Sequence, residues 1–327
     1  MFQSMKIKGK RLIAFGTLLF LCGVLAGCGY FTIIRVAEIG EVETAFNEIS
    51  TTALQMRTSQ SDFLTKDIKN ENFMESGKSI YVSNMRKLAA VQDSIISSLL
   101  ENKWSAKLDI REDLTNLKTN FEAYHNTFSK LTEAYKKRGL KDFGDEGELR
   151  AAVRAVEESD YKIDMVQLLT LRRIEKDFFL RKDTRDVEKF TAEITAFLDK
   201  IDNGGKGQEL KIKIATYEAK FNAVVKDEET IGLNEKLGLL GEMGNNIYTF
   251  EPIIEKLEKL SNARYREMVF QTILTFALVC LIELIAGFVL AIKFSNSLNS
   301  NIRYVRQAAI KLSETIVPEQ LEVKPQR

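Results

Sequence analysis

Two long apolar segments enclose a region in which apolar and charged residues recur with helical spacing. Residues 12–34 carry no charge, and residues 268–292 are interrupted only by Glu283. A helix as long as the first segment rises about 34 Å, which exceeds the roughly 30 Å of a bilayer's hydrocarbon core. The pattern therefore predicts two transmembrane helices.

Between these segments, apolar residues follow steps of three, four, seven and eight, which place them on one face of a helix. The clearest stripe comprises Leu149, Val153, Val156, Ile163, Leu171, Ile174 and Phe178. Glycine-rich breaks occur at Gly77, 139–147, 202–207 and 238–244. They divide the region into predicted helices over 35–68, 78–102, 107–137, 145–182, 185–202, 207–231 and 239–267. We expect the last helix to continue into the second apolar segment.

Part of this pattern occurs twice. Five apolar positions recur after 93 residues: Leu117, Phe121, Tyr124, Phe128 and Leu131 match Leu210, Ile214, Tyr217, Phe221 and Val224. After one inserted residue, Gly144, Gly147 and Glu148 match Gly238, Gly241 and Glu242. Shared helical periodicity would align apolar residues but not glycines. The repeat predicts a helix–turn–helix unit used twice, too widely spaced for a solenoid.

These elements predict an all-α fold with two stacked antiparallel four-helix bundles between the transmembrane helices. The predicted order is a cytoplasmic N-terminus (1–11), a first span (12–34), an extracytoplasmic domain (35–267), a second span (268–293) and a linker (294–327). Each bundle would bury the apolar stripes of about four helices.

The charges beside the apolar segments predict their orientation. Basic residues precede the first segment and follow the second, whereas Glu38, Glu41 and Glu43 follow the first. The positive-inside rule then places both chain ends in the cytoplasm and residues 35–267 outside a bacterial inner membrane, in the periplasm or the exterior. Two alternatives remain for the first segment: a cleaved signal peptide, or a lipoprotein signal with its lipobox cysteine at Cys28.

The amino-acid composition limits the partners and the kinds of site that we expect. The formal net charge of +1 does not favour nucleic acid as a partner. All three cysteines lie in the apolar segments and the only histidine is His125, so the central region has no thiolate metal site and little histidine chemistry. No phosphate loop or nucleophile elbow is present. We therefore expect no metal, no cofactor and no enzymatic activity.

Glu283 lies in the middle of the second apolar segment. An ionisable group at that depth costs about 2.5–3.5 kcal/mol on insertion scales and should face protein. It is either a polar contact between helices, for example at a dimer seam, or a protonated and tolerated residue.

The segment Leu171-Arg172-Arg173-Ile174-Glu175-Lys176-Asp177-Phe178 resembles the Arg-Arg-x-Glu-Lys-Asp-Phe core of the helical bimodular (HBM) sensor domain of bacterial chemoreceptors. The turn at 238–243 is similar to that family's entry into its last helix. The resemblance covers about 35–267 and implies two stacked modules, recognition of small organic acids, and homodimers.

Arginine suits such a ligand, because its planar fork binds a carboxylate through two parallel hydrogen bonds. The resemblance points to Arg172 and Arg173 as ligand-binding residues, and we add Arg57 from the first helix of the domain. The alternative is ordinary helix ion pairing, since Glu175 and Asp177 lie three and four residues after these arginines.

Residues 294–327 begin like a HAMP linker, with Ile316-Val317-Pro318-Glu319 resembling the exit from its first helix; the proline usual near its start is missing. The chain would be a fragment of a longer receptor, or a short protein that pairs with full-length receptors. The leading hypothesis is a chemoreceptor input module for a small carboxylate. The alternatives are the input half of a sensor histidine kinase, and an envelope protein that binds another protein.

Overall fold

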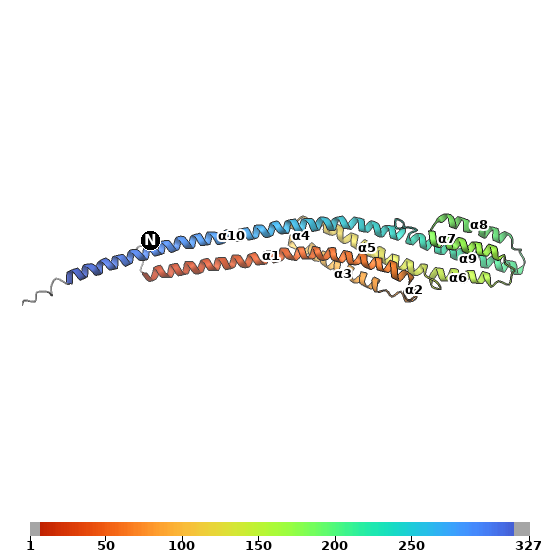
Figure 1. Cartoon of the computed structure of the whole chain (residues 1–327), viewed down its shortest axis with the longest axis horizontal. Helices are drawn as coiled ribbons and strands as arrows, with labels where there is room; N and C mark the ends of the chain where they lie inside the picture. The colour runs from red at the N-terminus through yellow and green to blue at the C-terminus, as the bar shows by residue number, and fades with distance from the viewer. Residues whose placement is uncertain (1–6, 317–327) are drawn as a thin grey trace, which may run out of the picture. The chain divides into compact units, whose positions relative to one another are not determined.

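The structure, a computed structural model, describes residues 7–316 and is built from helices (Figure 1). These are α1 (Ile7–Lys66), α2 (Glu71–Ser76), α3 (Ile80–Glu101), α4 (Lys103–Lys107), α5 (Arg111–Arg138), α6 (Gly144–Glu157), α7 (Met165–Arg181), α8 (Thr184–Asp199), α9 (Gly205–Ile231) and α10 (Gly238–Ile316). A 3-10 turn, Asp67–Lys69, follows α1. Residues 7–316 contain no strand beyond an isolated bridge between Leu140 and Phe143, so the all-α prediction is confirmed.

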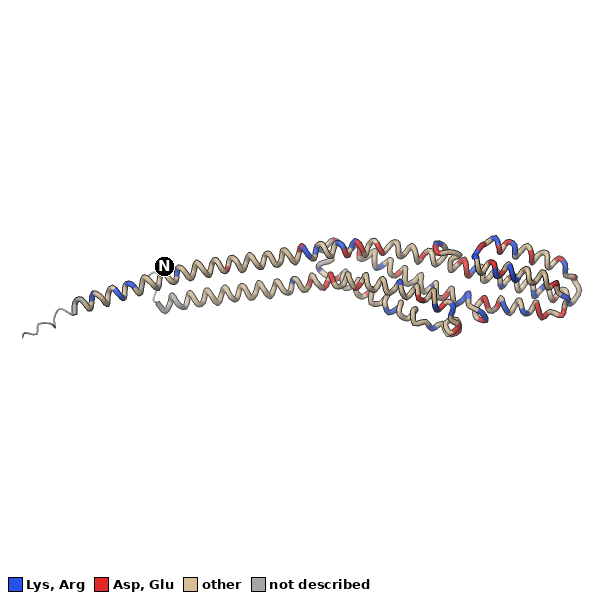
Figure 2. The backbone as a smooth tube through the Cα atoms, in the orientation of Figure 1, with Lys and Arg blue, Asp and Glu red and all other residues tan. Residues whose placement is uncertain are grey.

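The chain divides into two compact units. Of the described residues, one unit comprises 7–41 and 263–316, and the other is Val42–Asn262. In the first unit, α1 and α10 each contain a segment long and apolar enough to cross a membrane, and the side chains of both segments are exposed rather than packed in a core. Figure 2 shows these segments almost free of charged residues. The predicted HAMP exit at Val317-Pro318-Glu319 lies outside the described residues.

Two sets of buried side chains lie within Val42–Asn262. Core A joins α1, α2, α3, α5 and α10: Phe63 packs edge-on against Phe73 and Phe128, and Phe250 stacks on Phe121. Core B joins α6, α7, α8 and α9. Its largest members are Phe178, Phe190, Phe197, Tyr217 and Phe221. Aromatic pairs of this kind contribute about 0.5–1.5 kcal/mol each beyond their buried area.

The predicted single helix over 145–182 is wrong, because α6 ends at Glu157 and α7 begins at Met165. Glu157 and Glu158 place negative charge at the end of α6, where the helix dipole disfavours it. Asp164 then caps α7 by accepting hydrogen bonds from the N–H groups of Val166 and Gln167. The apolar stripe misled the prediction because both helices bury their share of it in core B.

The repeat seen in the sequence is confirmed at its two turns. Gly139 and Gly232 end α5 and α9 with positive φ, and each donates a backbone hydrogen bond to the residue four before it. A Cβ atom at Gly139 would lie 1.9 Å from the Phe143 carbonyl oxygen, and one at Gly232 would lie 2.2 Å from that of Leu237. Only glycine fits either turn, because L residues rarely adopt such angles and the space is filled.

The duplication also includes α1 and α7, at an offset of 115 residues. Residues 52–63 and 167–178 share nine of twelve burial assignments, and Arg57, Asp62 and Phe63 match Arg172, Asp177 and Phe178. Phe63 meets Phe128 with ring centroids 5.5 Å apart at 76°, and Phe178 meets Phe221 at 5.6 Å and 77°. The contact between α1 and α5 in core A therefore recurs between α7 and α9 in core B.

Candidate functional site

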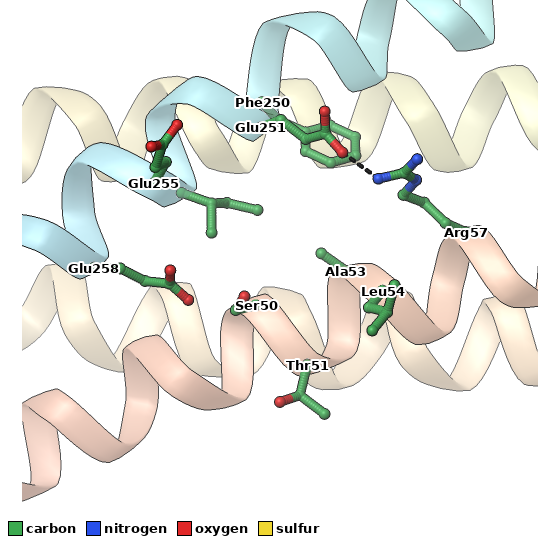
Figure 3. Close-up of a pocket in the computed structure, with 10 residues that line it drawn as sticks. Ser50, Thr51, Ala53, Leu54, Arg57, Phe250, Glu251, Glu255 and Glu258 are labelled. Carbon is green, nitrogen blue, oxygen red and sulfur yellow. Dashed lines mark hydrogen bonds and ion pairs between the residues drawn. The ribbon is translucent and has the colours of Figure 1, made fainter.

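A groove of about 460 Å³ lies between α1 and α10 within Val42–Asn262 (Figure 3). Its walls are formed by Ser50, Thr51, Ala53, Leu54, Arg57, Phe250, Glu251, Ile254, Glu255 and Glu258. The α1 wall combines three small side chains, Ser50, Thr51 and Ala53, with the larger Leu54 and Arg57. This volume is within the range of small-molecule sites, and its lining combines apolar surface with a few charged groups.

Charge is distributed unevenly around the groove. The guanidinium of Arg57 donates to the carboxylate of Glu251, and both side chains are about half exposed. Glu255 pairs with Lys259 at 2.5 Å. The half-buried Glu258 has no hydrogen bond or ion pair to any residue in the described part of the chain. Arg57 is thus the one cationic side chain among the lining residues, against three carboxylates.

Arg57, one of the three predicted ligand-binding residues, therefore lines a cavity. Its ion pair with Glu251 is accessible to water and so contributes little stability, because exposed pairs are typically worth about 1 kcal/mol or less. A ligand carboxylate can displace such a partner at small cost.

Arg172 lies in a different environment on α7. It donates to both oxygens of Glu175 at 3.0 and 2.8 Å, and the same carboxylate accepts from Lys176 and from the hydroxyl of Tyr217 at 2.8 Å each. The side chain of Glu175 is only 1% exposed. Burial, followed by the neighbouring charge of Glu175, raises the pKa of Tyr217, which keeps the hydroxyl protonated as a donor. This buried carboxylate is fully satisfied by its own chain.

Arg173 is exposed on α7 and forms no ion pair with any residue in the described part of the chain. The structure thus places the three predicted arginines in three surroundings. Arg57 lines the groove, Arg172 is bound to Glu175, and Arg173 faces solvent. They do not form one site.

Glu283 belongs to the other unit, in the membrane-length part of α10. One of its carboxylate oxygens is buried and has no hydrogen-bond partner among the described residues.

A second cluster of charge joins α5, α6 and α9. Lys137 bridges Asp145 at 2.7 Å and Asp227 at 2.5 Å, and Arg138 bridges Glu146 at 3.0 Å and Glu228 at 2.8 Å. Burial, aided by the nearby carboxyl of Asp145, raises the pKa of Asp227 to about 6, although Lys137 opposes the shift. For Asp145, burial also favours the neutral form, but hydrogen bonds with Lys137 and Asp227 and the positive charges of Lys137 and Lys220 together outweigh it and lower the pKa. No group of three or more histidine, cysteine or acidic residues among those described is arranged to hold a metal ion.

No protein-family model matches the chain, and no curated protein is significantly similar to it. Interpretation of the groove therefore depends on its geometry. The sequence pointed to Arg57 but not to the acidic wall, because Glu251, Glu255 and Glu258 have the spacing of an ordinary solvated helix face. The repeat matches Glu251 with Glu157, but that match does not indicate that Glu251 lines a cavity.

Proposed function

We propose that this chain is the input half of a transmembrane receptor that binds a small solute outside the cytoplasm. The observation that carries the proposal is that the groove lies between α1 and α10, the two helices that also contain the membrane-length segments. A solute held by residues of both helices would favour one packing of α1 against α10 over another. Differential binding of this kind is all that a ligand needs to shift a two-state equilibrium.

Helix α10 suits the transmission of such a shift. It is a single helix from Gly238 to Ile316, which contains both groove residues and the membrane-length segment. Pro252 lies inside this helix beside Glu251. A proline removes one helical hydrogen bond and clashes with the preceding turn, which gives α10 a point at which bending is easy.

The finer features of the proposal follow the resemblance to HBM chemoreceptors. Core A and core B would be the two stacked four-helix bundles, and Arg57 would bind a carboxylate of the solute. The receptor would sit in a bacterial inner membrane with its helical domain in the periplasm or the exterior. It would act as a homodimer or as a partner of full-length receptors, with Glu283 at the seam between copies. The charge pattern beside the apolar segments supports the orientation. The cost of an ionisable group at membrane depth supports a protein contact for Glu283.

Titration calorimetry on the full chain in lipid nanodiscs tests the proposal, with a panel of amino acids, amines and mono-, di- and tricarboxylates. We expect at least one compound to bind, and R57Q to weaken that binding at least about tenfold. R173Q is the matched control, because it removes an exposed arginine outside the groove. No binding across the panel, or equal loss in both variants, would contradict the groove as a receptor site.

A further inference from the structure

The groove lining suggests which kind of solute fits. One guanidinium faces three carboxylates, and the lysine paired with Glu255 offsets only one of them. A dicarboxylate would therefore enter a site that already carries excess negative charge, and only one of its two groups would meet a cation. A ligand with a positive group as well as a carboxylate would complement the lining at both ends.

The Arg57–Glu251 pair allows an exchange that conserves ion pairing. A ligand carboxylate takes the place of Glu251 on Arg57, and the released Glu251 carboxylate accepts a hydrogen bond from the ligand's ammonium group. In an α-amino acid, the two groups are separated by a single carbon, so both can be met at one end of the groove. Helix rise places Glu255 about 6 Å and Glu258 about 10 Å farther along α10, within reach of a polar or basic side chain.

The groove lining on α1 differs in part from the matching stretch of α7. Ser50, Thr51 and Ala53 correspond to Met165, Val166 and Leu168. Ser50 and Ala53 are smaller than their counterparts, whereas Thr51 and Val166 are of similar size.

The partner of the arginine also differs between the two copies of the repeat. Glu175 binds Arg172 in core B, but its counterpart in core A is Gln60, whose amide oxygen accepts from Tyr124 at 2.5 Å. An amide cannot neutralise a guanidinium, so Arg57 faces the groove and its exposed partner instead. The chain thus departs from its own repeat beside the groove, where Arg57 pairs with Glu251 of α10 rather than with a residue of its own helix.

We propose that the groove binds a zwitterionic amino acid, with the ligand carboxylate on Arg57 and the ligand ammonium on Glu251. This inference rests on the proposed receptor function and specifies its ligand class. The resemblance led us to expect a simple organic acid, whereas this inference requires a ligand that also carries a positive group.

The test compares analogues of one amino acid on the full chain in nanodiscs: the zwitterion that binds best in a screen of the common amino acids, its N-acetyl form, its methyl ester, and succinate. We expect the zwitterion to bind at least about tenfold more tightly than each of the others, because each lacks one charged group that the site pairs. E251Q should weaken the zwitterion and leave the N-acetyl form unchanged or tighter. E157Q, at the equivalent position in the other copy and outside the groove, is the control.

The outcomes separate this inference from the proposed function. If succinate or the N-acetyl form binds more tightly than the zwitterion, and R57Q abolishes that binding, the zwitterionic ligand class is wrong. The groove would still be the receptor site. Equal weakening by E251Q and E157Q would also overturn the zwitterionic ligand class. No binding of any compound would overturn both.

Discussion

The hydroxyl of Tyr217 donates a 2.8 Å hydrogen bond to the buried carboxylate of Glu175, and 93 residues earlier Tyr124 donates an equivalent bond to Gln60. The two tyrosines are fully buried at matching positions of the repeat. Their acceptors differ in charge: Glu175 also binds Arg172 of its own helix, whereas Arg57, near Gln60, pairs with Glu251 of α10.

Replacing Glu175 tests its structural role. E175Q replaces the carboxylate that pairs with both Arg172 and Lys176 by a neutral amide, which forms weaker hydrogen bonds to them. We expect the free energy of unfolding to fall by about 1–3 kcal/mol, since bonds to charged groups are worth about that much. Chemical denaturation of the full chain in detergent measures it. E157Q, an exposed position on α6, should change stability by no more than about 0.5 kcal/mol; equal effects would refute the role given to Glu175.

The reverse substitution tests why Arg57 faces the groove. Q60E supplies core A with the carboxylate that core B already has, three residues from the arginine. We expect Arg57 to turn to this new partner, and solute binding in the nanodisc titration to weaken at least about tenfold. Q55E adds the same charge two residues before Arg57, a spacing at which helix side chains do not face each other. It should leave binding nearly unchanged, and weakening by Q55E alone would contradict the account.

The two glycine turns predict a matched pair of effects. G139A and G232A each force a Cβ atom into backbone at positive φ, and each should cost about 1–3 kcal/mol. At Gly244, inside α10, an added Cβ atom would meet nothing within 4 Å, so G244A should raise stability by about 0.5–1 kcal/mol. Thermal and chemical denaturation of the three variants compares them. A harmless G139A with a harmful G232A would show that the turns are not equivalent.

Much of the fold follows from the sequence because helical periodicity and glycine breaks are local signals. The gap between α6 and α7 could not be predicted in this way, because the apolar stripe continues across it. The chain leaves the helix after Glu157 and starts a new one at the cap of Asp164. The α1–α7 match was missed for another reason. Its offset of 115 residues differs from the 93 of α5 and α9, because the connecting segments differ in length.

The site could be predicted only in part. Arg57 was identified as a candidate from its residue type, and it does line the groove. Arg172, which carries the resemblance to HBM domains, is bound by Glu175 instead. Arg57 pairs with Glu251, which lies 194 residues away on α10. Such a contact is a tertiary property that the spacing of residues along the sequence does not give.

The raised pKa of Asp227 predicts that the free energy of unfolding increases as the pH is lowered. Its pKa in the folded protein, about 6, exceeds the ordinary value of 3.8, so the folded state binds this proton more tightly than the unfolded state does. The group therefore stabilises the fold as the pH falls through 6 towards 4, by on the order of 2 kcal/mol, and the benefit is absent above pH 6. The lowered pKa of Asp145 acts in the opposite sense, but below about pH 4.

Denaturation of the full chain at pH 7.5, 6 and 5 isolates this contribution by comparison with D227N, which is neutral throughout. We expect the free energy of unfolding of the wild type to rise relative to that of D227N as the pH falls over this range. D199N, at an exposed position of α8, should track the wild type. A gap between wild type and D227N that stays constant with pH would rule out titration of Asp227.

The central claim is that two membrane helices hold Val42–Asn262 outside the cytoplasm while both chain ends lie inside. Since the natural cysteines are only Cys22, Cys28 and Cys280, serine at those positions gives a background free of thiols. Single substitutions K200C and S313C are then labelled with a membrane-impermeant maleimide in intact cells. We predict labelling of K200C before permeabilisation and of S313C only afterwards; labelling in the opposite order would contradict the account.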